Sequence, residues 1–127
     1  MKTINHMFWG KVRKGKSRGK KLGFPTANIA LHKKIPEGVY ISQTKINNIW
    51  HPSLTFIGAA KTFGETQVQA ETYLLYFNTV QYQSIITVKL LKKIRGNKKF
   101  HSPEALVAQM GMDKKAARTY FQKYPGV

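Results

Sequence analysis

Hydrophobic and polar residues alternate in five segments of the chain, and such alternation is typical of half-buried β-strands. The pattern predicts strands over residues 7–13, 38–46, 49–56, 68–77 and 83–94. Asn47 and Asn48 separate the second and third segments, and asparagine tolerates the positive φ that a tight hairpin turn needs. Asn78 and Thr79 precede the last segment in a similar way. Short antiparallel strands joined by such turns favour a small closed or nearly closed barrel, which has no exposed sheet edges.

The C-terminal part of the chain has helical features instead. A helix start is indicated by an N-cap residue, a proline at the first position and an acid in the first turn, which are Ser102, Pro103 and Glu104. This helix is expected to continue to about Met110, where Gly111 would end it. Asp113 would then cap a second helix that runs through Tyr124.

Length and composition indicate a single folded domain over residues 1–127, large enough for one core. The chain has no cysteine, which excludes disulfides, thiolate nucleophiles and cysteine-ligated zinc. No apolar run is long enough to span a bilayer, and the N-terminus lacks the features of a signal peptide. We therefore expect a cytoplasmic protein that does not insert into membranes and is monomeric.

The charge is unusual, because 22 Lys and Arg residues face only 5 Asp and Glu residues, for a formal net charge of +17. Such a balance predicts attraction to polyanions. The positive residues are scattered along the chain rather than gathered in a tail. This distribution favours weak, salt-sensitive and non-specific contact with nucleic acid over specific recognition.

Two neutral oxygen ligands stand close together in the segment Gly23 to Asn28. Pro25 favours an extended backbone, in which Thr26 and Asn28 project to one side and Ala27 to the other. A hydroxyl and an amide oxygen in this arrangement can bind a hard cation such as Mg²⁺, which takes the rest of its ligands from water and nucleotide phosphates. The segment follows a basic loop rich in glycine, namely Gly15, Lys16, Ser17, Arg18, Gly19, Lys20 and Lys21. Together they indicate a Mg-nucleotide site, although a solvated loop leading into a strand has the same composition.

One of the five acidic residues lacks an ordinary structural explanation. Turns and helix ends account for Glu37, Glu65, Glu104 and Asp113. Glu71 instead shares one side of its strand with the apolar residues Tyr73, Leu75 and Phe77. A carboxylate on such a face is costly unless it is paired, hydrated in a cleft or used in catalysis. A salt bridge to one of the many lysines is the alternative explanation.

The sequence resembles the riboflavin kinases, which phosphorylate riboflavin to FMN, from about Phe8 to the C-terminal helix. The most specific match is Pro25-Thr26-Ala27-Asn28 followed by a single glutamate in a later strand. Further matches occur in the same order, at Gly10-Lys11-Val12, Gly15, Gly19, 36–40 (PEGVY), 56–58 (FIG), 62–63 (TF), 71–75 (ETYLL), 99–100 (KF) and 102–106 (SPEAL).

This resemblance implies a mainly β fold, a six-stranded Greek-key antiparallel β-barrel with a C-terminal helix. It implies a kinase module without the FMN adenylyltransferase domain that many bacterial relatives carry, which uses ATP and Mg²⁺ to convert riboflavin to FMN and ADP. Glu71 would be the catalytic base, and Thr26 and Asn28 would hold the metal. The loop residues 15–21, with Pro25 and Thr26, would bind the nucleotide. Arg95 would contact the flavin or a phosphate, unless it is only a surface arginine.

The chain also departs from the family pattern, mainly where the family shapes its flavin side. The departures are Ala60, Lys61, Tyr76, Gln83, Gly96 and Asn97. Two other functions therefore stay open. One is a basic barrel that binds nucleic acid, with stacking platforms drawn from Phe8, Trp9, Trp50 and Tyr73. The other is a non-catalytic flavin or nucleotide binder, but the retention of Thr26, Asn28 and Glu71 together favours catalysis.

Overall fold

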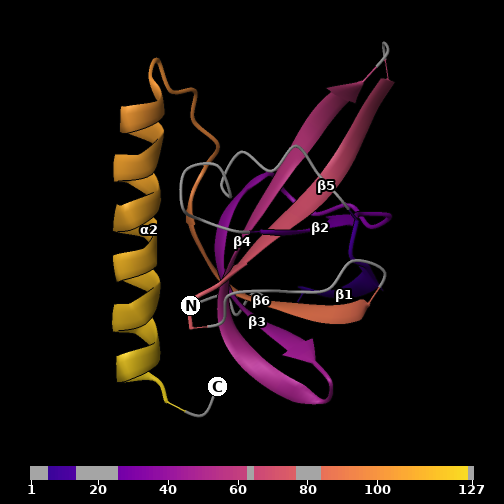
Figure 1. Ribbon diagram of the computed structural model, residues 1–127, viewed down its shortest axis with the longest axis vertical. Helices are drawn as coiled ribbons and strands as arrows, with labels where there is room; N and C mark the ends of the chain where they lie inside the picture. Colours follow the sequence, from indigo (N-terminus) through magenta and orange to yellow (C-terminus); the bar gives the residue numbers. More distant parts are fainter. Residues whose placement is uncertain (1–5, 14–25, 63–64, 77–83, 126–127) are drawn as a thin grey trace.

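The computed structural model describes residues 6–13, 26–62, 65–76 and 84–125, which form six β-strands and a long helix (Figure 1). The strands are β1 (His6–Lys11), β2 (Ala27–Ala30), β3 (Gly38–Ile46), β4 (Ile49–Thr62), β5 (Glu65–Leu74) and β6 (Ile85–Arg95), and the helix is α2 (Pro103–Lys123).

The strands form one antiparallel sheet in the order β1-β6-β3-β4-β5-β2. β3, β4 and β5 are neighbours in both sequence and space, and β6 returns to pair with β3, which is a Greek-key arrangement. The two edge strands, β1 and β2, are brought together at one end by an antiparallel bridge between Arg13 and Asn28. The Arg13 backbone N–H donates to the Asn28 carbonyl at 2.7 Å. The predicted six-stranded barrel with a C-terminal helix is therefore confirmed.

The boundaries of the strands differ in part from those that the alternation predicted. The turn between β3 and β4 is confirmed, since Asn47 and Asn48 have φ angles of 50° and 66°. β4 continues to Thr62, well past the predicted end at residue 56. The alternation did not predict β2, which has only four residues. Of the predicted turn at Asn78 and Thr79 nothing can be said, because both lie outside the described residues.

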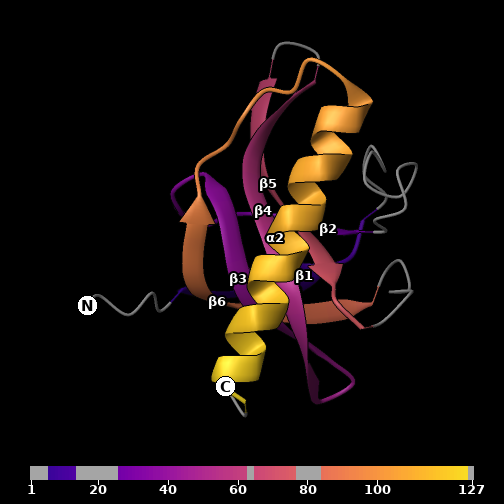
Figure 2. The same ribbon diagram turned by 90° about the vertical axis from the view of Figure 1, so that its left-hand side faces the viewer.

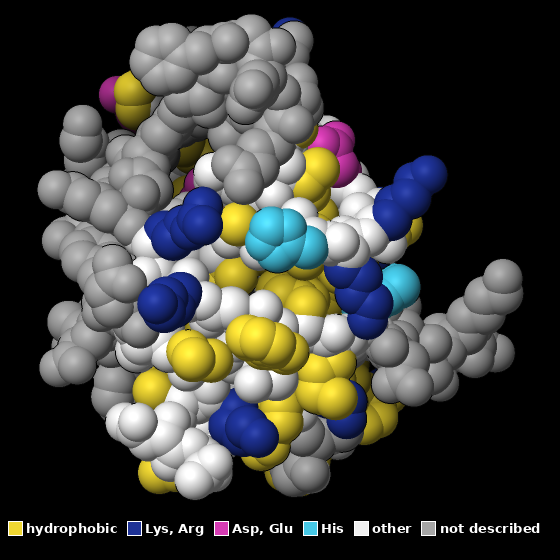
Figure 3. Space-filling model, turned by 90° about the vertical axis from the view of Figure 1, so that its right-hand side faces the viewer, with side chains coloured by type: hydrophobic (Ala, Val, Ile, Leu, Met, Phe, Trp, Pro, Cys, Tyr) yellow, Lys and Arg dark blue, Asp and Glu magenta, His cyan; other side chains and the backbone are white. Residues whose placement is uncertain are grey.

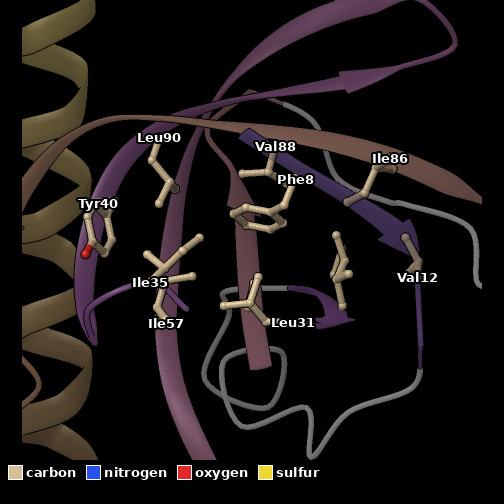
Figure 4. Packing of buried hydrophobic residues seen from close by; sticks show 12 residues of the cluster. Phe8, Val12, Leu31, Ile35, Tyr40, Ile57, Ile86, Val88 and Leu90 are labelled. Carbon is tan, nitrogen blue, oxygen red and sulfur yellow. The ribbon is translucent and has the colours of Figure 1, made fainter. Parts of the chain in front are cut away.

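The inside of the barrel holds one large apolar cluster, to which every strand of the sheet contributes (Figure 4). Phe8 from β1 and Ile86, Val88 and Leu90 from β6 point inward, each at most 7% exposed. Tyr40 lies in the same cluster, and its hydroxyl donates to the Pro36 carbonyl at 2.5 Å. Burial raises the pKa of the Tyr40 phenol, which keeps this group neutral as a donor.

The barrel interior also contains a ladder of buried hydroxyl groups on β3, β4 and β5. Four hydrogen bonds of 2.7–3.0 Å connect them in the order Thr44, Ser53, Ser42, Thr55 and Thr72. Each residue is at most 1% exposed. A hydroxyl both donates and accepts, so this chain satisfies its members within the ladder and couples the three strands across the sheet.

Helix α2 lies against the outer face of the barrel and crosses β3 and β4 (Figure 2). Its buried Ala117 packs with Val39, Ile41, Leu54 and Tyr73 from three strands. The predicted start is confirmed, since the Ser102 side chain accepts from the Ala105 N–H at 3.1 Å and Pro103 occupies the first turn.

The prediction of two helices is wrong, because α2 runs without a break through residues 110–113. Gly111 does not end it, and Asp113 is no cap but a buried residue that is 3% exposed. Met110, Asp113 and Ala117 are all buried against the barrel, so packing on both sides of Gly111 outweighs the low helix propensity of glycine.

Candidate active site

The short strand β2 presents Asn28 on the outer face of the barrel. Its neighbours Ala27 and Ile29 point into the apolar interior, so alternation places Asn28 on the opposite side, as predicted. The residue is nevertheless only 5% exposed. Thr26 directly precedes the strand, two positions from Asn28.

The register of the sheet brings Glu71 to Asn28. Glu71 in β5 is the direct partner of Asn28 in β2 on one side and of Phe56 in β4 on the other. Directly opposite residues of an antiparallel pair point to the same face, with Cβ atoms about 4.5–5.5 Å apart. The predicted catalytic carboxylate and the predicted metal ligand, far apart in the sequence, therefore stand side by side.

Two buried oxygens at this place lack a hydrogen-bond partner in the described part of the chain. They are Thr26 Oγ1 and Asn28 Oδ1. Leaving a buried polar atom unsatisfied costs on the order of 1–3 kcal/mol, and such an atom in a native protein calls for an explanation, an ion among them. Both are hard neutral oxygens, the donors that Mg²⁺ accepts beside phosphates and water. The two residues therefore fit a divalent cation.

Within the described part of the chain, side chains that bind metals through charge or imidazole are not gathered at any other place. In residues 6–13, 26–62, 65–76 and 84–125, no group of three or more His, Cys, Asp or Glu side chains could hold a metal ion. A cation at Thr26 and Asn28 would thus rely on few protein ligands, which suits a metal that arrives with a nucleotide.

A cleft of about 590 Å³ opens between β1 and the segment that follows β2. It is lined by Met7, Phe8, Trp9, Gly10, Lys11, Arg13, Ile29, Ala30, Leu31, His32, Lys33 and Ile85. Gly10 allows the two edges to approach closely, because a Cβ at this position would clash with Ile29 Cγ2. The cleft begins beside the candidate metal site, since Arg13 is both a lining residue and the bridge partner of Asn28.

Arg13 is a candidate that the sequence did not reveal. As the bridge partner of Asn28, this exposed arginine shares the outer face with it and adds positive charge next to the unsatisfied oxygens. Only closure of the barrel brings the end of β1 to the start of β2, so no local pattern could have indicated the pair.

On the other side of Glu71, aromatic side chains meet cations of α2. Tyr73 lies on the same face of β5 as Glu71, and Lys114 Nζ is 5.4 Å from the centre of its ring. The guanidinium carbon of Arg118 is 5.5 Å from the ring centre of Tyr76, which is 64% exposed. Glu71 thus lies between Asn28 of β2 on one side and Phe56 of β4, which packs against the cluster under α2, on the other.

Arg95, at the end of β6, is held by Asp113 of α2. Its Nε donates to Asp113 Oδ1 at 2.9 Å and its NH2 group to Asp113 Oδ2 at 2.7 Å, while NH1 donates to the Gly96 carbonyl at 3.2 Å. Gln109 Nε2 also donates to Asp113 Oδ1, at 3.0 Å. The arginine that we predicted to contact flavin therefore ties the helix to the barrel.

Several predicted residues cannot be placed. The nucleotide-binding residues Gly15, Lys16, Ser17, Arg18, Gly19, Lys20, Lys21 and Pro25, and the departure Gln83, lie outside the described residues. Of the other departures, Asn97 donates from Nδ2 to the Ile57 carbonyl at 3.1 Å. Within the described ranges, no helix is long and apolar enough to cross a membrane.

The chain resembles known proteins over most of its length. A family model described as "Flavokinase: Riboflavin kinase" matches residues 3–121. The chain is 38% identical over 117 residues to the trifunctional protein RibF/MnmA of Mycoplasmoides gallisepticum, covering 90% of this chain and 18% of that protein. It is 35% identical over 118 residues to the bifunctional riboflavin kinase/FMN adenylyltransferase of Bacillus subtilis, covering 88% of this chain and 37% of that protein.

A solved structure supports the same relationship. The riboflavin kinase from Trypanosoma brucei superposes with a TM-score of 0.64 at 27% sequence identity, covering 93% of this chain and 80% of that one. The chain thus corresponds to well under half the length of the two curated relatives and to most of the solved kinase.

Proposed function

Because the chain belongs to the riboflavin kinase (flavokinase) family, we propose that it transfers the γ-phosphoryl group of ATP to the ribityl 5′-hydroxyl of riboflavin, giving FMN and ADP. The observation that carries this proposal is the register of β2 and β5, which sets Glu71 directly opposite Asn28. This pairing supports Glu71 as a general base beside a place suited to the metal of a metal–nucleotide complex.

Glu71 is the proposed base. The 5′-oxygen of riboflavin attacks the γ-phosphorus, the bond from that phosphorus to the bridging oxygen of ADP breaks, and the hydroxyl proton passes to the Glu71 carboxylate. A carboxylate within about 3 Å of the hydroxyl is enough for this transfer, because positioning and electrostatics dominate phosphoryl-transfer reactions.

Thr26 Oγ1 and Asn28 Oδ1 would hold the divalent cation, which we propose to be Mg²⁺. Their support is that both oxygens are buried and unsatisfied among the described residues. Such a cation, when bound, neutralises negative charge on the nucleotide phosphates. Arg13 would add a fixed positive charge on the same side, where phosphate oxygens carry the negative charge.

The two substrates would approach Glu71 from opposite sides. The cleft beside Arg13 has room and apolar lining for the base and ribose of the nucleotide, with Lys11 and Lys33 at its edge. The loop residues 15–21 and Pro25 stay predicted contacts of the phosphates. Riboflavin would lie on the side of Phe56, which is only partly buried and can pack against the flavin ring.

Arg95 stays a predicted flavin contact, although its guanidinium already makes hydrogen bonds within the protein. Its donors already bind Asp113 and the Gly96 carbonyl, and Phe100 covers it with 5.9 Å between guanidinium carbon and ring centre. A contact with flavin would therefore use the remaining face of the guanidinium plane rather than its hydrogen-bonding edge.

Replacement of the proposed base tests this function directly. Glu71→Gln keeps the size of the side chain but removes the proton acceptor, so FMN formation should fall by at least about 100-fold while the protein stays folded and binds nucleotide. Chromatography of the flavins formed from riboflavin, ATP and Mg²⁺ measures the rate. Near-normal FMN formation by this variant would remove Glu71 from the mechanism.

A further inference from the structure

The proposed kinase function leaves most of the high positive charge of the chain without a role. All five acidic residues occur at positions 37, 65, 71, 104 and 113. None of them lies in β1, β3 or β6, or in the first half of β4. The part of the sheet formed by β1, β6 and the β3–β4 hairpin therefore carries lysines without any carboxylate of its own.

The registers of the three strand pairs align four side chains across this part of the sheet. Trp9 of β1 is opposite Thr87 of β6, Thr87 is opposite Lys45 of β3, and Lys45 is opposite Trp50 of β4. Directly opposite residues share a face, and Phe8 and Val88, the neighbours of Trp9 and Thr87, point into the barrel. The four residues, here named the tryptophan row, thus lie on the outer face.

Both tryptophans of the row are available to a ligand. Trp9 is 70% exposed and Trp50 is 39% exposed, although burial of such large rings is usual in a folded domain. Lys45 Nζ lies 5.5 Å from the centre of the Trp50 ring, so a cation accompanies the aromatic face. The other two platforms that the sequence suggested, Phe8 and Tyr73, are each 7% exposed and therefore buried.

Lysines flank the row on both sides. Lys89 is the partner of Met7 and Gln43 in the neighbouring row, and Lys11 is the partner of Ile85 on the far side of Trp9. Four strands at a spacing of about 4.8 Å place the backbones of Trp9 and Trp50 no more than about 14 Å apart. On the side of the molecule turned away from α2, hydrophobic side chains lie among separate Lys and Arg side chains (Figure 3).

We propose that the tryptophan row and its flanking lysines bind single-stranded nucleic acid. Bases would stack on Trp9 and Trp50, and Lys11, Lys45 and Lys89 would contact the phosphates between and beside them. Base stacking on exposed aromatic rings combined with a basic surface is how proteins bind single strands without reading their sequence. A duplex hides the faces of its bases, so the single strand is the form that this surface fits.

Variants at Trp50 can test the tryptophan row independently of the nucleotide cleft. Trp9 also lines the cleft, so its replacement can affect both ATP and nucleic acid. Trp50 and Lys45 are not among the residues that line the cleft, and neither belongs to the proposed kinase machinery. Variants at Trp50 and Lys45 should therefore lower nucleic-acid binding and leave the rate of FMN formation unchanged.

The test is binding of fluorescein-labelled oligouridylate RNA and oligothymidylate DNA, measured by fluorescence anisotropy at several salt concentrations. Trp50→Ala and Trp9→Ala should each weaken binding by about 5-fold or more, the lower end of what a stacked base contributes. Lys45→Gln should weaken binding and also reduce its dependence on salt, because one phosphate contact is lost. A duplex of the same length should bind more weakly than either single strand.

A matched control uses the same chemistry at a distant place. Lys123 Nζ lies 5.6 Å from the ring centre of Tyr124, which is 45% exposed, at the end of α2. The Lys123→Gln, Tyr124→Ala double variant removes one charge and one exposed ring. Its affinity for single-stranded nucleic acid should stay close to that of the unaltered protein, with only a small loss from the missing charge. Equal losses in this control and in Trp50→Ala, or no binding of either single strand at low salt, would overturn the proposal.

Discussion

At the scale of single residues, the site depends on two oxygens that the fold buries and does not satisfy within the described residues. Thr26 Oγ1 and Asn28 Oδ1 pay a desolvation cost that a bound cation would offset. Hydroxyl and amide oxygens are weak ligands compared with carboxylates, so such a cation would exchange together with its nucleotide. This chemistry suits a kinase, which must release a metal–nucleotide product in every cycle.

Removing either oxygen should therefore weaken the metal site. In Thr26→Ala and in Asn28→Ala, the Mg²⁺ concentration that gives half-maximal FMN formation should rise, because each change deletes one proposed ligand. A titration of activity with Mg²⁺ at saturating ATP and riboflavin measures this effect. Gln43→Ala, which deletes an amide side chain of β3 that does not line the cleft, is a control that keeps both ligands.

If both alanine variants keep the Mg²⁺ dependence of the unaltered protein while remaining folded, the two side chains are structural. A fall in maximal rate without a change in Mg²⁺ dependence would point the same way, toward packing rather than metal binding.

The sequence indicated these residues separately but not their arrangement. Alternation around Pro25 predicted that Thr26 and Asn28 face one way, and the apolar neighbours of Glu71 marked it as unusual. That Glu71 stands opposite Asn28, and Arg13 beside it, depends on strand pairing across the barrel. Pairing of this kind follows from the whole topology, which local patterns do not contain.

At the scale of elements, α2 is a single helix because its tertiary contacts overrule a local signal. Glycine lowers helix stability by about 0.8–1.0 kcal/mol relative to alanine, which made Gly111 a reasonable predicted end. Sequence propensity could not weigh this cost against the burial of Met110 and Ala117 on the barrel. The hydroxyl ladder was missed for a related reason, since Ser and Thr in alternating positions are typical of exposed faces.

Replacement of Gly111 by alanine should stabilise the protein. A Cβ at this position would meet no atom within 4 Å, and the residue sits inside a continuous helix. Gly111→Ala is expected to raise the free energy of unfolding by about 0.5–1 kcal/mol, and the unfolding midpoint by about 2–6 °C. Thermal and urea unfolding measure both quantities.

Gly96→Ala is the matched control, since its Cβ also meets nothing within 4 Å but it lies outside any helix or strand. Both substitutions restrict the unfolded chain. Any larger gain in the free energy of unfolding from Gly111→Ala than from Gly96→Ala therefore comes from the helix. Destabilisation by Gly111→Ala would contradict a continuous α2.

The pair formed by Arg95 and Asp113 should be the strongest polar tie between α2 and the barrel. Their side chains are 18% and 3% exposed, and the bonded atoms are 2.7 Å apart at the closest. Asp113→Asn would leave a largely buried guanidinium without its counter-charge, which costs on the order of 3 kcal/mol in unfolding free energy. Urea unfolding measures the loss, and Glu104→Gln, an exposed acid of the same helix, is the control. Equal and small losses in the two variants would contradict a structural role for the pair.

At the scale of the whole molecule, different parts of the outer face of the barrel carry different proposed functions. One stretch of the outer face, from Arg13 through Asn28 to Glu71 and Phe56, carries the proposed chemistry. The helix covers the face of β3 to β5 beyond it, and the tryptophan row occupies the outer face of β1, β6 and the β3–β4 hairpin. The order of the strands around the barrel thus determines which side chains can act together.

Much of this architecture could be predicted from the sequence. Alternation and turn signals predicted five of the six strands, the Asn47-Asn48 turn and a closed or nearly closed barrel, and the family resemblance supplied the count of six strands and the Greek-key order. The single helix, the strand ends and the cleft between β1 and β2 depend on long-range packing. The family resemblance assigned roles to Thr26, Asn28 and Glu71, which the residue pattern had already marked, but the place of the positive charge became visible only through the registers.

The most direct measurement of the central claim is a time course of flavins and adenine nucleotides with riboflavin, ATP and Mg²⁺, separated by chromatography. The 127-residue chain should form FMN and ADP in equal amounts, with neither FAD nor pyrophosphate, because the described residues form one barrel with one proposed phosphoryl-transfer site. Folded protein that binds both substrates yet forms no FMN would contradict the account and would leave a non-catalytic binder in its place.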